Sequence, residues 1–248
     1  MHKCAADFLP LILSVGILTS GLVSCRSYDD VSGPQSDVSP DELMARMKAS
    51  YDPNGVLQNA KAYYLKQKLQ VEGKQTFIEM TFKFPDKSRT VTTVDGKVQS
   101  LLLYNGEKCW MIGGSGEREQ LKGEDLERFK LFNALGATAK IGLKEVFENV
   151  YVFDDDSGVE KMFRVVCVPK FKGLAPIVIY VGKDDYLTKK IVTKRAGLSY
   201  VAETKKYSLV RGVMVASETQ ISYAADNDRL TLVEYKLDPE TEDAMFEP

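Results

Sequence analysis

Apolar and polar residues alternate with a period of two along most of this chain. In 63–71 tyrosine and leucine alternate with lysine and glutamine, and in 78–84 isoleucine, methionine and phenylalanine alternate with glutamate, threonine and lysine. Strict alternation indicates strands with one buried and one wet side, as in antiparallel sheets. Asn-Gly and Asp-Gly dipeptides, at 105–106 and 95–96, predict hairpins between such runs. We therefore expect residues 63–121 to form a meander of five or six strands.

Two segments follow a helical pattern instead. The sequence Ser-Pro-Asp-Glu at 39–42 is typical of a helix start, because serine caps, proline suits the first position and glutamate completes a capping box. Leu43, Met44 and Met47 would give this helix one apolar side. In 124–136 apolar residues recur every three positions after two acidic residues, which predicts a second helix.

After the second helix the strand pattern resumes and continues to the end of the chain. Seven strands are expected, near 146–153, 159–169, 175–182, 186–195, 199–209, 213–223 and 229–237. At 232–233 the apolar positions change parity, which indicates a β-bulge with one extra residue. The expected fold class is mainly β (α+β): a curved, antiparallel, incomplete barrel of about a dozen strands, with two or three helices covering its concave face. No linker separates the two halves, so 40–248 is expected to form one domain.

The side of this sheet that would face inward is rich in large, flexible or aromatic residues. The candidate lipid-binding residues are Tyr63, Leu65, Leu69, Met80, Phe82, Phe84, Trp110, Phe129 and Phe132. A solid core and a pocket for an acyl chain are built from these same residue types. The pattern therefore leaves both interpretations open.

The first 24 residues follow the pattern of a bacterial lipoprotein signal peptide. A short basic start precedes an apolar run, 8–23, which is shorter than the roughly 20 apolar residues of a membrane span. Leu-Val-Ser-Cys at 22–25 forms a lipobox, in which Cys25 would carry acyl chains such as palmitate. An ordinary secretory leader with an incidental thiol at Cys25 is the alternative.

Removal of 1–24 would leave a lipidated cysteine and a tether over 25–39. The tether is rich in serine, aspartate, glycine and proline, a composition that favours a flexible coil. Arg26, rather than an aspartate, follows the cysteine. This favours an anchor in the outer membrane, with the body facing the periplasm.

Composition excludes several classes of function. The formal net charge is −2, so the chain lacks the basic balance that nucleic-acid binding calls for. The single histidine, His2, lies in the leader, which leaves the mature chain without Ser-His-Asp, Cys-His or histidine-ligated metal sites. The run 154–158, Asp-Asp-Asp-Ser-Gly, has its glycine one place early for a calcium loop and is interpreted as a hairpin turn. We expect no cofactor, no metal and no enzymatic activity.

Cys109 and Cys167 are the cysteines that remain in the body. A secreted compartment permits a disulfide between them. The alternative is two buried thiols on strands, because free cysteine is among the most buried residue types.

Three segments resemble the LolA/LolB-like outer-membrane lipoprotein carrier superfamily. They are Phe-Lys-Phe-Pro-Asp-Lys-Ser-Arg at 82–89, Tyr-Asn-Gly-Glu-Lys-Cys-Trp at 104–110, and the closing Met-Phe-Glu-Pro at 245–248. The resemblance extends over roughly 40–248. It implies an incomplete antiparallel barrel with a helical lid over a hydrophobic concavity that binds acyl chains. Arg89 matches the arginine that fastens the lid in the carriers, and its alternative role is a solvated cation on a strand.

The sequence therefore leaves two alternative functions. The first is a membrane-anchored envelope lipoprotein that binds acyl chains of lipoproteins or lipids, in outer-membrane lipoprotein sorting or lipid transport. The second is a non-enzymatic envelope scaffold on the same fold, which binds a protein partner by strand addition at an exposed sheet edge.

Overall fold

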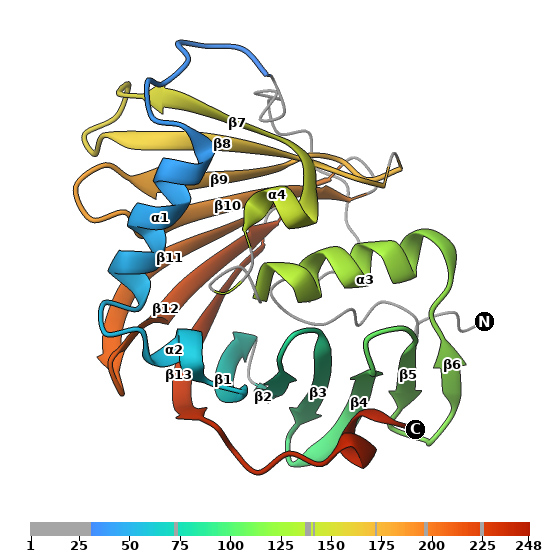
Figure 1. The fold of residues 1–248 in the computed structure, drawn as a ribbon. Coiled ribbons are helices and arrows are strands. Elements are labelled where there is room, and N and C mark those ends of the chain that lie inside the picture. The colour runs from blue at the N-terminus through green and yellow to red at the C-terminus, as the bar shows by residue number, and fades with distance from the viewer. Residues whose placement is uncertain are drawn as a thin grey trace. The chain divides into compact units, whose positions relative to one another are not determined.

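The structure is a computed structural model that describes residues 31–71, 74–136, 140, 142–171, 173–195, 198–223 and 226–248 (Figure 1). The expected signal peptide and Cys25 lie outside the described residues. Two compact units make up the chain: Asn59–Ala137 with Asp228–Pro248 form the first, and the described residues up to Gln58 with Thr138–Asn227 form the second. None of the described helices combines the length and the apolarity that a membrane crossing requires.

The first unit is a sheet with one long helix. Its elements are β1 (Ala62–Val71), β2 (Lys74–Lys83), β3 (Lys87–Val94), β4 (Lys97–Tyr104), β5 (Cys109–Gly113), β6 (Arg118–Gln120), α3 (Gly123–Gly136), most of β13 (Asp226–Leu237) and the 3₁₀-helix η1 (Asp243–Phe246). The strands follow the order β6-β5-β4-β3-β2-β1-β13. In Figure 1, α3 runs across the strands of this unit.

The second unit has the same kind of construction. It contains α1 (Pro40–Tyr51), α2 (Val56–Asn59), α4 (Leu143–Val146), β7 (Phe147–Asp155), β8 (Met162–Pro169), β9 (Ile177–Gly182), β10 (Thr188–Arg195), β11 (Leu198–Val210) and β12 (Val213–Tyr223). Its strand order is β12-β11-β10-β9-β8-β7. The helix α1 crosses these strands in Figure 1.

The expected fold class is confirmed. The described residues are mainly β: thirteen antiparallel strands, in an order that does not close on itself, accompany four α-helices. Strands β1–β6 confirm the meander expected over 63–121, and β7–β13 lie where the alternation resumes. The single-domain boundary 40–248 stays a prediction.

Ser39 and Pro40 act as expected at the start of α1, whereas Glu42 pairs with Arg46 and the expected capping box is not formed. The Ser39 hydroxyl accepts a hydrogen bond from the backbone N–H of Glu42 at 3.2 Å, which caps the helix. Leu43, Met44 and Met47 are buried, as their spacing predicts. The Glu42 carboxylate pairs with Arg46 one turn later. The helix therefore starts where its cap residue lies and buries one side.

The expected bulge lies in β13. Lys66 of β1 pairs with Glu234, and the next residue, Gln67, pairs with Leu232, so Val233 is the extra residue. Its side chain is 53% exposed. The change in apolar parity at this point is therefore the consequence of one unpaired residue in the ladder.

The end of the expected tether differs from a flexible coil. The Ser36 N–H donates to the Val152 carbonyl at 3.0 Å, and the Asp154 N–H donates to the Pro34 carbonyl at 3.0 Å, so this segment lies along the edge strand β7. Composition predicts a coil over 25–39 because it counts only apolar burial. Backbone hydrogen bonds to an edge strand provide another way to order the chain.

The acidic run at 154–158 spans the last two residues of β7 and the start of the hairpin turn that leads to β8. The Lys183 ammonium lies 2.7 Å from an Asp154 oxygen and 2.9 Å from an Asp156 oxygen. The side chains that suggest a calcium loop are therefore paired with a lysine. Within the described ranges, no three acidic, histidine or cysteine residues gather as a metal site.

Cys109 and Cys167 are free and fully buried. They lie in β5 and β8 respectively. Burial raises the pKa of the Cys109 thiol to about 12 and also raises the pKa of Cys167. The interpretation as two buried thiols on strands is confirmed, and the disulfide is not formed.

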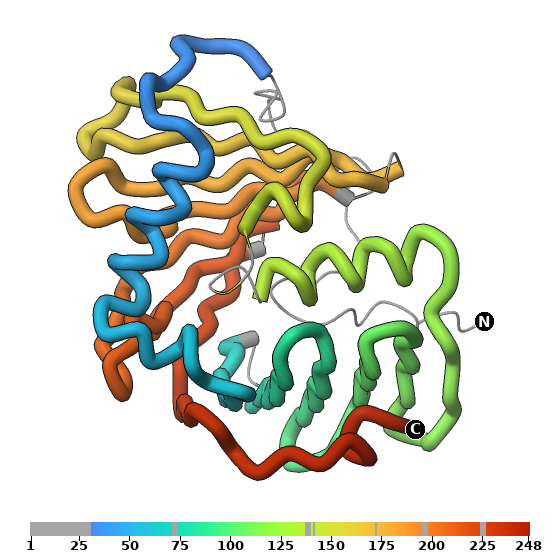
Figure 2. Tube along the Cα trace, in the orientation of Figure 1, coloured from blue at the N-terminus to red at the C-terminus, as the bar shows by residue number. Residues whose placement is uncertain are grey.

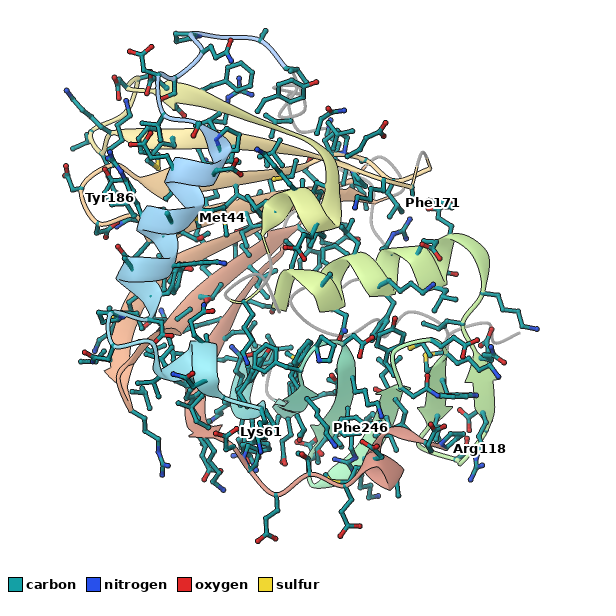
Figure 3. All side chains as sticks on the ribbon, in the orientation of Figure 1. Met44, Lys61, Arg118, Phe171, Tyr186 and Phe246 are labelled. Carbon is teal, nitrogen blue, oxygen red and sulfur yellow. The ribbon has the colours of Figure 1, made fainter. Side chains whose placement is uncertain are left out.

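The segment after β13 runs along one end of the strands of the first unit (Figure 2). Lys83 and Lys87 both pair with Asp243, at 2.7 and 3.1 Å. The Asn105 amide donates to Glu247 at 2.9 Å. Phe246 is fully buried beside β3 and β4 (Figure 3). The C-terminal residues therefore belong to the first unit.

Candidate functional site

The register of the first unit defines the side of the sheet that α3 covers. Tyr63 pairs with Phe82 and Leu65 with Met80, and the same parity continues into β4 and β5. The apolar members of this side, which we call the inner face, are Tyr63, Leu65, Leu69, Ile78, Met80, Phe82, Leu102, Tyr104, Cys109 and Met111. Alternation in each strand thus places an apolar surface, interrupted on β3 by hydroxyl side chains, under one helix.

The N-terminal half of α3 packs directly on the inner face. Phe129 is buried in a cluster with Leu102, Tyr104, Cys109 and Leu121. Its ring meets the Tyr104 ring edge to face, with centroids 5.2 Å apart. This cluster attaches α3 to the inner face through Phe129.

Four aromatic rings gather at the other end of the inner face. Tyr63 stacks on Phe82 with centroids 5.3 Å apart and planes 4° apart. The Phe84 ring lies 5.1 Å from Phe82, and the Tyr235 ring lies 6.1 Å from Tyr63. Burial raises the pKa of Tyr63, so its phenol stays protonated at physiological pH. The cluster is uncharged and suits an apolar ligand.

The C-terminal half of α3 approaches this aromatic cluster closely. A Cβ on Gly136 would lie 3.0 Å from the Tyr63 hydroxyl oxygen, so glycine permits the approach. The Asn133 amide donates to the Asp86 carbonyl at 2.7 Å. Phe132 is half-buried on the helix. This half of α3 is therefore held by a close contact and a hydrogen bond.

Most of the candidate lipid-binding residues come together in the first unit. The inner face carries Tyr63, Leu65, Leu69, Met80 and Phe82. Phe84 joins them through its ring contacts, and α3 supplies Phe129 and Phe132. Whether these residues bind lipid stays a prediction.

Trp110 and Arg89 lie on the opposite side of the sheet. Leu103 pairs with both of them, and Leu103 alternates with the inner-face residues of β4. The sequence does not predict the side on which Trp110 lies, because apolar residues occupy both the odd and the even positions of β5. The pKa of Glu79 is lowered mainly by a hydrogen bond from Lys66, and the positive charge of Arg89 makes a smaller contribution in the same direction. The inward placement of Trp110 is corrected, and Arg89 does not share the face that α3 covers.

The hydrophobic pattern does not reveal a row of hydroxyls on the inner face. Ser88 pairs with Phe82 and Tyr104, which places it on that face, and Thr90 and Thr92 follow at the same parity. Their side chains are 3%, 4% and 4% exposed. In the sequence these residues are marked only by their spacing of two, which predicts a solvent-exposed side of the strand. The pairing register of β3 shows that this side faces inward.

The second unit has a small surface pocket between α1 and α4. Its volume is about 240 Å³, and it is lined by Pro40, Asp41, Met44, Ala45, Lys48, Gly142, Leu143 and Lys144. Lys144 pairs with Asp41 at its rim. Asp41 offsets one of its two lysines, and its volume is below that of usual ligand pockets, about 300 Å³ or more.

The arrangement of strands and covering helix defines a class of fold, that of the LolA superfamily. A LolA superfamily protein from Nitrosomonas europaea superposes with a TM-score of 0.60 at 10% identity, over 85% of this chain and 98% of that chain. A putative outer membrane lipoprotein-sorting protein domain from Vibrio parahaemolyticus gives 0.56 at 12% identity, over 84% and 97%. A DUF1329 family protein from Desulfovibrio piger gives 0.55 at 11% identity, over 84% and 95%.

These likenesses confirm the resemblance to the LolA/LolB-like superfamily at the level of the fold. No family model and no curated protein matches the sequence.

Proposed function

We propose that this chain is a membrane-anchored envelope lipoprotein that binds acyl chains of lipoproteins or lipids on the inner face of the first unit. It would serve outer-membrane lipoprotein sorting or lipid transport, without turnover and without a cofactor. The observation that carries the proposal is an apolar and aromatic surface on the sheet that one helix, α3, covers. Each methylene that enters this surface contributes about 0.8 kcal/mol.

Admission of a chain requires α3 to move away from the sheet. The helix is attached by the Phe129 cluster and by the Asn133 hydrogen bond. Leu126 and Phe132 are only half-buried. An acyl chain would take over the contacts that α3 makes with the inner face, so the helix would act as a lid.

The relatives and the N-terminal sequence support an envelope location. One structural neighbour is described as a putative outer membrane lipoprotein-sorting protein domain. The lipobox at 22–25 would place Cys25 at the membrane surface. An envelope protein with a lipid anchor would hold its inner face close to the lipids that it binds.

Mass spectrometry of bound lipids tests the proposal. The 26–248 body, secreted through a cleavable leader and lacking Cys25, would be purified without added lipid and extracted. A stoichiometric acyl lipid is expected, and Met80→Asn on the inner face should reduce it. Val91→Asn, on the opposite face of β3, is the matched control and should retain it. A clean extract from the unmodified body, with no affinity for fluorescent acyl probes, would refute acyl binding.

A second candidate is a scaffold that binds a protein partner. Strand β6 ends the strand order of the first unit, and its three residues are exposed. An exposed edge can accept a strand from another chain. A lipid-free body that gains β-structure on binding an envelope peptide, and loses it after Glu119→Pro, would favour this function.

A further inference from the structure

The inner face carries a polar row inside its apolar surface. Ser88, Thr90 and Thr92 occupy consecutive inner-face positions of β3, and each is at least 96% buried. Among the residues that the structure describes, no side chain or backbone group is hydrogen-bonded to their hydroxyls. Buried hydroxyls nearly always have a partner, because leaving them unpaired costs free energy.

The neighbours of the row are apolar except opposite Thr92, where Ser100 of β4 adds a further hydroxyl that is only 4% exposed. On β2, Ile78, Met80 and Phe82 lie directly opposite. On β4, Leu102 and Tyr104 lie opposite Thr90 and Ser88. A ligand on this face would therefore meet a line of hydroxyl groups on β3, with hydrocarbon on both sides of Ser88 and Thr90 and the Ser100 hydroxyl beside Thr92.

We propose that this hydroxyl row binds the carbonyl oxygens that link acyl chains to the headgroup of the cargo. The inference rests on the proposed function and names its ligand class: an ester-linked diacyl lipid, as in the diacylglyceryl group of a lipoprotein. Hydroxyls donate hydrogen bonds to carbonyl oxygens. The methylenes that follow each carbonyl would pack on β2 and β4.

The geometry suits two linkages rather than one. Successive residues on one side of a strand lie about 7 Å apart, because each residue rises about 3.4 Å. Thr90 and Thr92 can therefore each address a different carbonyl of a diacyl group. An alternative role for the threonines is packing through their methyl groups, which valine would retain.

Competition between two lipids tests the inference. The full chain, purified in mild detergent, is offered equal amounts of a diester lipid and the matching diether lipid, which has the same chains but no carbonyls. We expect the unmodified protein to bind the diester preferentially. In the double variant Thr90→Val/Thr92→Val, the ratio of diester to diether affinity should fall about tenfold, which is the size expected for the loss of two neutral hydrogen bonds. Its affinity for the diether should stay unchanged.

Thr93→Val is the matched control, since Thr93 lies on the opposite side of the same strand. It should keep the preference for the diester. Equal binding of both lipids by the unmodified protein, or an equal loss of both in the double variant, would overturn the inference and leave acyl binding intact. Failure of both lipids to bind would instead refute the proposed function itself.

Discussion

The ring of Phe129 on α3 meets the ring of Tyr104 on β4 edge to face, with centroids 5.2 Å apart. Both side chains are 4% exposed. Burial first, and then the charge of Asp86, raises the pKa of Tyr104 to about 12. The neutral phenol donates to the Gly106 carbonyl at 2.8 Å. The position of Tyr104 is thereby fixed, and Phe129 attaches the helix to it.

Phe129→Ala should detach the N-terminal half of α3. Loss of a buried ring costs about 3 kcal/mol or more of unfolding free energy, which urea denaturation measures. Amides of α3 should exchange faster with solvent than those of β4. The half-buried Phe132 provides the control, since Phe132→Ala should cost clearly less. Equal losses for the two variants would contradict the assignment of Phe129 as the attachment point.

Asn133→Ala tests the hold on the other half of the helix. It removes the hydrogen bond to the Asp86 carbonyl, worth about 1 kcal/mol, without changing the apolar cluster. We expect a folded protein whose acyl probes both associate and dissociate faster in stopped-flow fluorescence. Lys130→Ala removes only a half-exposed pair with Glu127 on the same helix and should leave both rates unchanged. Unchanged rates in Asn133→Ala would argue against α3 as the lid.

The pairing of Asp243 predicts a dependence of stability on pH. Hydrogen bonds from Lys83 and then Lys87 lower the pKa of this carboxyl. A lowered pKa in the folded state stabilises the protein above the unfolded value of about 3.9, and this contribution is lost as the pH falls through the folded value. Asp243→Asn should therefore be less stable than the unmodified protein at pH 7 and equally stable in strong acid.

Urea denaturation at both pH values measures this difference. Because Asp243 is exposed, the difference at pH 7 should shrink in high salt. A deficit of Asp243→Asn that is the same at both pH values would contradict the electrostatic explanation.

The sequence predicts those features that one strand or one helix determines by itself. Alternation locates the strands, and even the bulge at Val233, because one extra residue shifts every later side chain to the other face. Capping and apolar spacing locate α1 for the same reason: Ser39 and Met47 act within their own helix.

Features that depend on pairing between strands are harder to predict. Trp110 and Met111 are both apolar, so only the register of β5 on β4 decides which faces inward. Thr90 is polar, and it is buried because it lies between Met80 of β2 and Leu102 of β4. The segment around Ser36 is likewise ordered by hydrogen bonds to the edge strand β7. The composition of the segment alone does not predict these bonds.

The two thiols of the body should be present and protected. In the 26–248 chain, Ellman's reagent should detect Cys109 and Cys167 after denaturation without a reductant. In the native protein both should react slowly, because burial raises the pKa of each and so disfavours the reactive thiolate. Cys109→Ser and Cys167→Ser should each remove one thiol from the denatured count. Absence of free thiols in the denatured, unreduced chain would show that a disulfide forms.

Ser36→Pro should release the segment that lies along β7. Proline lacks the N–H that Ser36 donates to the Val152 carbonyl, so the ladder loses a bond at its edge. Limited proteolysis should then cut within 31–39 faster, while the midpoint of global unfolding changes little because few apolar groups are involved. Ser36→Ala, which keeps the N–H, is the matched control and should resist proteolysis like the unmodified protein. If Ser36→Pro and Ser36→Ala are cut at the same rate, the hydrogen bond to β7 does not hold this segment in place.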